Sequence, residues 1–314
     1  MDLLDKSILF ELSSNCRVSF TFLAQKYEVT SNTIKNRVIK LEELQIIKKY
    51  VVELNPKLLN LNTAIIWIKF PSTINTETFL TLGQNNNISA IGIGLDAAFL
   101  VLNYQTNNEL AQIKDYVLQI LDIEEIIIFP VLPPLSIKSL IPKRSLEEIN
   151  DIEWYILSLL RNNARITLSD LSKKTNLSVK TLRRRIEKLH SDFIAFFTIQ
   201  MNPSVLRKGL MVIFALELKK LTLESQTLIE KEVKKNLGEK FWVSWQVVDR
   251  PIILLAFQAD NMFEVSNIAE TLRTIEKNFI SIQKLIGEKF EYFPDLFDRL
   301  LDEKIKKIKI NVKK

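Results

Sequence analysis

The sequence has few of the residues on which disulfides, metal centres and phosphate-binding loops depend. Its 314 residues include one cysteine, one histidine and six glycines. Cys16 has no partner for a disulfide or a thiolate metal site, so we interpret it as a small core or turn residue. The glycines form no Gly-rich phosphate loop, and we interpret His190 as a helix-end residue. We therefore expect a protein that is not an enzyme and has neither a metal nor a cofactor.

Long apolar runs are also missing. Runs such as LMVIFALEL at 210–218 are too short to span a bilayer, and the opening MDLLDKS is acidic where a signal peptide would be basic. We expect a cytoplasmic protein with no membrane partner. A hydrophobic content of 47% is typical of globular proteins. The net charge of +6 is compatible with binding to nucleic acid, but the location of the positive residues decides whether they form a binding surface.

The chain contains an internal repeat. With an offset of 148 residues, positions between Ile8 and Leu41 meet identical residues between Ile156 and Leu189, and Arg17 meets Arg165. One residue is then missing from the second copy, after which the Asn-Pro pair at 55–56 matches the pair at 202–203. A match of this length does not arise by chance, so we take duplication as the organising feature of the chain.

Each repeat opens with three stretches of helical pattern. In the first copy they are residues 5–12, 20–27 and 31–44, and a turn of about four residues separates the second helix from the third. Thr30 or Ser31 suits the N-cap of the third helix, and Ser178 takes this role in the second copy. The third helix has an apolar stripe and a polar, basic outer face. This arrangement predicts a helix-turn-helix whose third helix enters the major groove.

The spacing of particular residues carries a family resemblance. The first copy reads D-x-x-I-L-x-x-L-x-x-x-x-R from residue 5, Leu-Ala at 23–24, T-S-x-T-I-x-x-R-V-x-x-L-E from 30, and I-I-x-x-Y from 46. This pattern resembles the N-terminal domain of the Lrp/AsnC (feast/famine) transcription regulators. The second copy is similar at Leu168, Leu171, Ser178, Thr181, Arg185 and Leu189. The resemblance implies that each reader is followed by a ferredoxin-like domain that dimerises and often binds an amino acid.

The expected fold is α+β, with two winged helix-turn-helix domains alternating with two ferredoxin-like βαββαβ domains of the Lrp/AsnC effector type. Both copies have the strand and helix patterns that this order requires. We place the winged helix-turn-helix domains at 1–60 and 149–207, the ferredoxin-like sensor domains at 61–132 and 208–294, a Pro-containing linker at 133–148, and a basic C-terminal helix or tail at 295–314. A docking helix is slightly favoured over a DNA-gripping tail for the last segment.

The sequence departs from the family pattern at several turns. Lrp/AsnC members usually have glycine before and after the third helix, but here these positions hold Glu28 and Gln45, and Asn176 in the second copy. Asn tolerates a left-handed backbone, and Glu adopts it at a small cost. A short wing hairpin is expected after each third helix. The second wing reads AFF at 195–197 where the first reads KKY at 48–50, so we expect the second wing to pack on protein.

The expected DNA contacts lie on the third helices and the first wing. Asn suits adenine, whereas Arg suits guanine or a phosphate. Arg37 and Arg185 lie at the edge of the apolar stripe, where bracing the domain or holding a phosphate is expected more than reading a base. The second reader is more basic, with a net charge of +5 over 170–190 against +2 over 22–42. The candidate DNA-binding residues are Ser31, Asn32, Lys35, Asn36, Arg37, Lys40, Lys48, Lys49, Lys180, Arg183, Arg184, Arg185 and Lys188.

The candidate effector residues are Gly94, Asp96 and Asp249. The segment IGIGLDAAFL resembles the Gly-x-x-Asp hairpin of the family's effector site, although its spacing is shorter by one residue, and a tight or bulged hairpin explains these residues equally well. The equivalent VVDRPIIL keeps the aspartate without the glycine. Trp242 and Trp245 fit sheet packing better than a ligand cage.

The sequence thus predicts a sequence-specific DNA-binding transcription regulator with two non-equivalent reading heads and double-stranded DNA as its partner. Response to an amino acid or another small effector is left open. We expect the two sensor domains to pair within the chain, because tethering gives a high local concentration; further homo-oligomerisation is left open. The alternative is a sirohaem-decarboxylase-like enzyme on the same duplicated fold, although no matching His, Arg and Tyr positions are found. A protein-binding scaffold is a third reading.

Overall fold

The computed structural model describes residues 2–71, 75–94, 96–132, 141–202, 210–276, 279–287, 289–294 and 296–308. The chain divides into two compact units, each built from both repeats. The head unit comprises residues 1–60, 141–202 and 294–314, and the sheet unit comprises residues 61–140 and 203–293. In the described ranges no helix is both long and apolar enough to cross a lipid bilayer.

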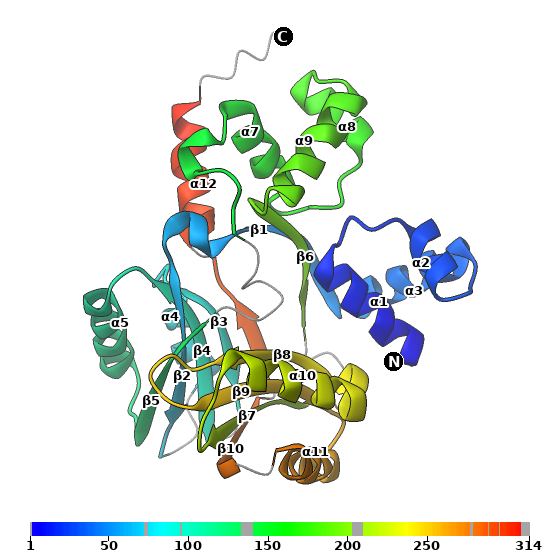
Figure 1. Cartoon of the computed structure of the whole chain (residues 1–314). Helices are drawn as coiled ribbons and strands as arrows, with labels where there is room; N and C mark the ends of the chain where they lie inside the picture. The colour runs from blue at the N-terminus through cyan, green and yellow to red at the C-terminus, as the bar shows by residue number, and fades with distance from the viewer. Residues whose placement is uncertain are drawn as a thin grey trace. The chain divides into compact units, whose positions relative to one another are not determined.

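In the described residues, each head contains three α-helices followed by one strand, which are labelled in Figure 1. The first head contains α1 (Leu3–Ser14), α2 (Phe20–Lys26), α3 (Ser31–Glu43) and β1 (Ile47–Leu54), with η1 (Pro56–Leu59) after it. The second head contains η2 (Leu146–Glu148), α7 (Asp151–Leu160), α8 (Leu168–Thr175), α9 (Val179–Ser191) and β6 (Ala195–Met201). Each helix of both heads starts at a side-chain cap, because Ser, Thr, Asp or Asn accepts a hydrogen bond from the first turn.

The wing strands correct the expectation of a hairpin in each head. β1 pairs antiparallel with β6, so the two-stranded sheet joins the heads and belongs to neither alone. A two-stranded hairpin within one head would leave the apolar residues of these strands exposed to water. Pairing across the repeats buries Val51, Val52 and Phe197. Ala195 is buried as well, so the second wing packs on protein as expected.

Equivalent residues exchange hydrogen bonds between the heads. Arg17 donates to the carbonyls of Ala164 and Ile166, and Arg165 donates to those of Cys16, at 2.6 Å, and Val18. The Cys16 amide donates to the Phe197 carbonyl at 2.7 Å, and the Ala164 amide donates to the Tyr50 carbonyl at 2.9 Å. The head unit therefore has an approximate internal twofold symmetry that follows the sequence repeat.

The C-terminal segment forms a docking helix. α12 (Leu296–Lys307) packs on α7 and buries Phe297 and Leu301. Arg161 of the second head pairs with Asp302 at 2.7 Å, and the Lys304 ammonium lies 5.5 Å from the Trp154 ring centre. These contacts favour the docking helix over the DNA-gripping tail for residues 296–307. Residues 309–314 lie outside the described ranges.

The sheet unit contains two βαββαβ domains. The first comprises β2 (Asn62–Lys69), α4 (Thr76–Leu82), β3 (Ile88–Ile93), β4 (Ala97–Tyr104), α5 (Asn107–Ile120) and β5 (Glu125–Val131). The second comprises β7 (Leu210–Leu218), α10 (Leu223–Leu237), η4 (Gly238–Lys240), β8 (Phe241–Gln246), β9 (Ile252–Ala259), α11 (Met262–Ile275) and β10 (Phe279–Gly287). The strand orders β3-β4-β2-β5 and β8-β9-β7-β10 are those of a ferredoxin-like sheet.

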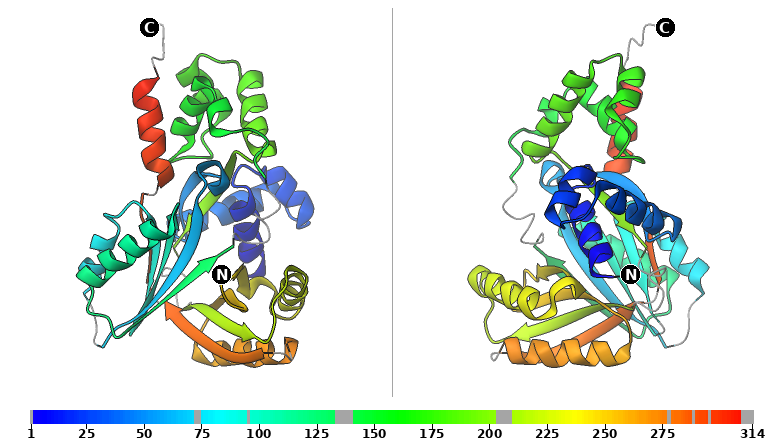
Figure 2. Two further views of the ribbon diagram at one scale, coloured as in Figure 1. Left: turned by 60° about the vertical axis from the view of Figure 1, so that its left-hand side comes forward. Right: turned by 90° about the vertical axis from the view of Figure 1, so that its right-hand side faces the viewer.

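The two sheets pack face to face within the chain. Helices α4 and α5 cover the outer face of the first sheet, and helices α10 and α11 cover that of the second (Figure 2). An apolar core fills the space between the sheets. Ile65, Phe99 and Phe129 of the first domain meet Ile213, Leu254 and Leu285 of the second in this core. The expected pairing of the two sensor domains within one chain is present.

Backbone pairing also connects the two sheet domains. After β10, β11 (Lys289–Tyr292) adds antiparallel to β3 of the first sheet. At the end of β5, Val131 forms an isolated bridge with Val247, and the Leu132 amide donates to the Gln246 carbonyl at 2.8 Å. Each sheet domain therefore makes backbone contacts with the other, by a full strand in one direction and by an isolated bridge in the other.

Candidate nucleic-acid interface

The first recognition helix, α3, exposes the face that the sequence assigned to DNA. The Thr30 hydroxyl accepts a hydrogen bond from the Thr33 amide at 3.0 Å and starts the helix. Ile34, Val38 and Leu41 are buried and fix the rotation of the helix about its axis. The side chains opposite are exposed; they are Ser31, Asn32, Lys35, Asn36, Ile39 and Lys40.

The second recognition helix, α9, is built in the same way. The Ser178 hydroxyl accepts from the Thr181 amide at 3.1 Å, and Leu182, Ile186 and Leu189 are buried. The exposed side chains on the opposite face are Lys180, Arg183, Arg184, Glu187 and Lys188. One face therefore presents mainly amides and lysines, and the other mainly arginines and lysines.

The turns around these helices have the backbone that the family pattern implies. Glu28 and Asn176 precede the recognition helices with φ of 54° and 56°, and Gln45 and Phe193 follow them with φ of 56° and 55°. The expectation of left-handed residues at 28, 45 and 176 is confirmed. Phe193 is an additional case, and the repeat offset from Gln45 was the signal that could have identified it.

The edge arginines have different surroundings. The Arg37 guanidinium pairs with Asp5 at 3.0 Å and with Asp2, so it braces α3 against the start of α1. Arg185 occupies the equivalent place in α9, but within the described part of the chain it makes no ion pair, and its Nε is buried without a hydrogen-bond partner. Lys48 and Lys49 are exposed on β1 beside a register irregularity.

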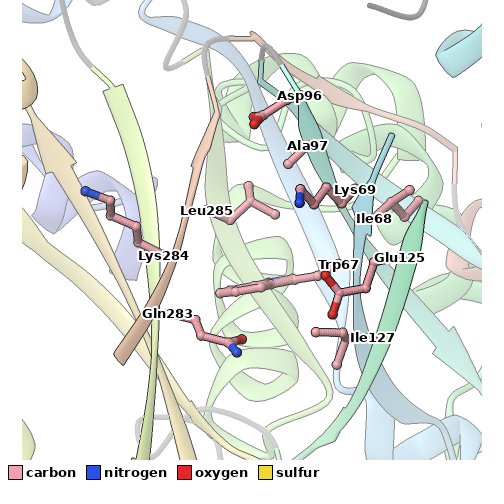
Figure 3. Close-up of a pocket in the computed structure, with 10 residues that line it drawn as sticks. All are labelled: Trp67, Ile68, Lys69, Asp96, Ala97, Glu125, Ile127, Gln283, Lys284 and Leu285. Carbon is pink, nitrogen blue, oxygen red and sulfur yellow. The ribbon is translucent and has the colours of Figure 1, made fainter. Parts of the chain in front are cut away.

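A second candidate site is a pocket of about 240 Å³ in the sheet unit. Trp67, Ile127 and Leu285 form its apolar lining, and Lys69 and Asp96 are among its polar groups. Lys69 pairs with Glu124 at 3.5 Å, whereas Asp96 forms no ion pair with any described residue. Figure 3 shows Lys284 directed away from the other labelled side chains. The Trp67 Nε1 is buried without a partner, so it is closed to a pocket ligand.

The other two effector candidates do not line this pocket. Gly94 is required by close packing, because a Cβ there would lie 2.1 Å from the Ile286 carbonyl oxygen. Asp249 pairs with Arg250 at 3.3 Å and lies near Tyr104, whose pKa is raised by burial and by the Asp249 charge. Of the three candidates, the structure brings only Asp96 to the pocket.

The remaining sequence candidates have structural roles. Trp242 and Trp245 pack against the core between the sheets, as expected. His190 lies in the last turn of α9 with its ring centre 6.0 Å from that of Phe197. Burial raises the pKa of Cys16 to about 12, so its thiol stays protonated. No group of three His, Cys, Asp or Glu side chains within the described ranges is placed to hold a metal ion.

Sequence reasoning missed the residues that position the two faces. Arg17 and Arg165 served only to align the repeats, yet they connect the heads. Arg144, assigned to a solvated linker, has a side chain that is only 14% exposed and pairs with Glu153 at 2.9 Å and Asp192 at 2.8 Å. Residues 133–140 of the expected linker lie outside the described ranges. No local pattern could reveal these partners: those of Arg17 and Arg165 lie 147 and 149 residues away, Asp192 lies 48 residues from Arg144, and the nine-residue separation of Arg144 and Glu153 matches no helical spacing.

Comparisons with known proteins support the helix-turn-helix character of the heads. A family model described as winged helix-turn-helix DNA-binding matches residues 149–192. An uncharacterized HTH-type transcriptional regulator of Pyrococcus horikoshii is 37% identical over 95 residues, which are 29% of this chain and 61% of that relative. The HTH-type transcriptional regulator LrpA of the same organism is 39% identical over 62 residues, which are 20% of this chain and 44% of LrpA. The match thus spans about three fifths of the first relative.

Solved structures of one protein match nearly the whole chain. The siroheme decarboxylase NirDL aligns over 97% of this chain and 99% of its own, with a TM-score of 0.56 and 13% identity. At this identity the likeness is one of fold. The sequence matches, by contrast, are to HTH-type regulators, and the family model covers residues 149–192 of the second head. The chain is therefore similar to HTH-type transcriptional regulators, LrpA among them, and its residues 149–192 match a winged helix-turn-helix DNA-binding domain.

Proposed function

We propose that this chain is a sequence-specific DNA-binding transcription regulator whose two heads read different halves of an asymmetric site. The observation that carries the proposal is the pair of exposed recognition faces in one unit, with Asn32 and Asn36 on α3 and Arg183 and Arg184 on α9. Asparagine matches adenine, and arginine matches guanine or a phosphate. The readers are residues 1–60 and 149–207, and the sensor domains are residues 61–132 and 208–294.

Sequencing of DNA fragments selected by the purified protein tests this proposal. We expect a site whose two halves differ in sequence, because the two readers of the chain expose different side chains. Lys231, exposed on α10 of the sheet unit, provides a control: Lys231→Ala should select the same site. A selected site with perfect twofold symmetry, or no enrichment over random DNA, would contradict the proposal.

We also propose that the pocket beside Asp96 takes a small effector such as an amino acid. Its volume corresponds to about eight water molecules, and Asp96 and Lys69 offer opposite charges to an ammonium and a carboxylate. Thermal shift assays with single amino acids test this, because a ligand that binds only the folded state raises the melting temperature. Asp96→Asn should remove the shift. No shift with any amino acid would contradict this part of the proposal.

A siroheme-decarboxylase-like enzyme is the second candidate, favoured by the whole-chain fold match. The pocket beside Asp96 is smaller than the roughly 300–1,000 Å³ typical of sites for drug-sized ligands, and the chain has only His190 as a histidine. Haem-type absorbance of the purified protein, or uptake of an iron tetrapyrrole, would favour this candidate over the regulator.

A further inference from the structure

The two edge arginines occupy equivalent positions but have different partners. In the first head, Arg37 of α3 binds Asp5 at 3.0 Å and also binds Asp2. Both carboxylates belong to the capping box that starts α1. A guanidinium held in this way is neutralised and positioned by its own head, and it is not free to move to another anion without losing these bonds.

In the second head, the equivalents of Asp2 and Asp5 are Asn150 and Glu153, which again form a capping box. The Glu153 carboxylate is only 3% exposed, and its partner is Arg144, from outside the three-helix bundle. Arg144 Nη1 and Nη2 donate to the two carboxylate oxygens at 2.9 and 3.2 Å, and its Nε donates to Asp192 at 2.8 Å. This bidentate pair occupies the site that Arg185 would use by analogy with Arg37.

Arg185 is left as a cation with no anion in the described part of the chain. It is half-buried at the edge of α9, one residue beyond the exposed Arg184, and its Nε makes no hydrogen bond. A guanidinium stays charged at any physiological pH, and a partly buried charge without a partner is unfavourable. An anion supplied from outside the protein would satisfy it, and the backbone of DNA against α9 presents phosphates at this edge.

We propose that Arg144 occupies Glu153 and thereby keeps Arg185 off α7, so that Arg185 binds a backbone phosphate of DNA. Arg144 is then a positioning residue for DNA binding that does not touch DNA itself. The inference rests on the proposed function, because it requires α9 to lie against DNA. In the first head Arg37 itself pairs with Asp2 and Asp5 and remains a brace there.

Fluorescence anisotropy with duplex DNA at several salt concentrations tests the inference. Loss of one phosphate contact lowers the salt slope by about 0.9, which corresponds to roughly eightfold weaker binding at 0.1 M salt. Arg185→Ala should produce this loss. Arg144→Ala should produce the same loss, because Arg185 then turns to Glu153. The double variant Arg144→Ala/Arg185→Ala should bind DNA no more weakly than either single variant.

A rescue variant separates this device from simple damage to the head. Arg144→Ala combined with Glu153→Gln removes the competing carboxylate and keeps an oxygen for the cap, so binding and salt slope should return to those of the native protein. Thermal unfolding checks that each variant is folded. Native affinity in Arg144→Ala, or persistent weakness in Arg144→Ala/Glu153→Gln, would overturn the inference. A native protein that does not bind DNA would instead refute the proposed function.

Discussion

The two heads bury equivalent side chains and expose different ones. Ile8, Leu12 and Leu41 of the first head and Ile156, Leu160 and Leu189 of the second are all at most 2% exposed. The first head exposes five large apolar side chains on its helices and at the C-cap of α3. They are Leu3, Phe10, Phe22, Ile39 and Leu44. At the repeat offset, the second head has Asp151, Ser158, Asp170, Glu187 and Asp192.

The two copies have therefore kept their core residues, which packing constrains, while their surface residues have changed independently. A core residue must fit its neighbours in volume and shape, so substitutions there are costly. A surface residue is free of that constraint and can be used for function. The second head carries more positive charge on its recognition helix and is covered by α12 on α7, whereas the first head exposes apolar area on α1 and α2. We therefore expect unequal contributions to DNA binding.

The largest expected effect comes from breaking the connection between the heads. The variant Arg17→Ala/Arg165→Ala removes hydrogen bonds from two guanidinium groups to backbone carbonyls, and we expect it to lower the free energy of unfolding by roughly 3 kcal/mol. Urea denaturation measures this. Because the contacts are reciprocal, the single variants should each cost about half as much.

Arg299, whose side chain is 63% exposed in its pair with Glu303, provides the matched control, and Arg299→Ala should be close to neutral. A double variant as stable as the native protein would show that β1–β6 pairing alone holds the heads. Clearly unequal single variants would show that the internal symmetry does not extend to the energetics.

The next prediction compares the recognition faces. Arg183→Ala/Arg184→Ala in the second head should lower the salt slope by about 1.8 and weaken binding to any duplex by roughly 60-fold at 0.1 M salt. Asn36→Ala in the first head should instead relax base choice at one position with little change on random DNA. Anisotropy with selected and random duplexes measures both. Equal losses on the two kinds of DNA for both variants would contradict this division of roles.

A third prediction sharpens the contrast between the edge arginines. Asp2→Asn/Asp5→Asn removes the carboxylates that hold Arg37 and keeps side chains that can cap α1. If Arg37 lies as close to DNA as we propose for Arg185, the salt slope should rise by about 0.9 and binding should strengthen roughly eightfold at 0.1 M salt. An unchanged slope would mean that the heads meet DNA differently.

The smallest expected effect concerns the left-handed turns. Gln45→Gly should raise the free energy of unfolding by roughly 1 kcal/mol, because glycine adopts this backbone without the steric cost of a Cβ. Asn176→Gly should gain less, because asparagine already tolerates the conformation. Thermal unfolding measures both. An equal gain at the two positions would show that asparagine has no advantage over glutamine in this backbone conformation.

The sequence was sufficient for features that depend on local spacing. The helices of both heads, their caps, the exposed faces of α3 and α9 and the left-handed turns at Glu28 and Asn176 all follow from residues within a few positions of one another. The βαββαβ order of the sheet domains also follows from alternating apolar patterns. Each of these is a short-range consequence of periodicity and backbone preference.

What the sequence left out depends on partners far along the chain. Nothing near β1 indicates that its partner is β6, because a strand's hydrogen-bonding groups do not specify which strand completes them. The partners of Arg17, Arg144 and Arg165 are fixed by the tertiary arrangement. The difference between Arg37 and Arg185 was likewise hidden, because it depends on a third arginine outside both repeated helices.

Strand pairing between the two repeats makes part of each repeat's structure depend on the other. β1 with β6 in the head unit, and β11 with β3 in the sheet unit, join residues of the first repeat to residues of the second. The peptide segment between Leu132 and Ile141 then serves mainly to raise the local concentration of one repeat around the other. Residues 1–140 and 141–314, produced as two separate chains, should fold only together, and their heterodimer should melt at a temperature that rises with concentration.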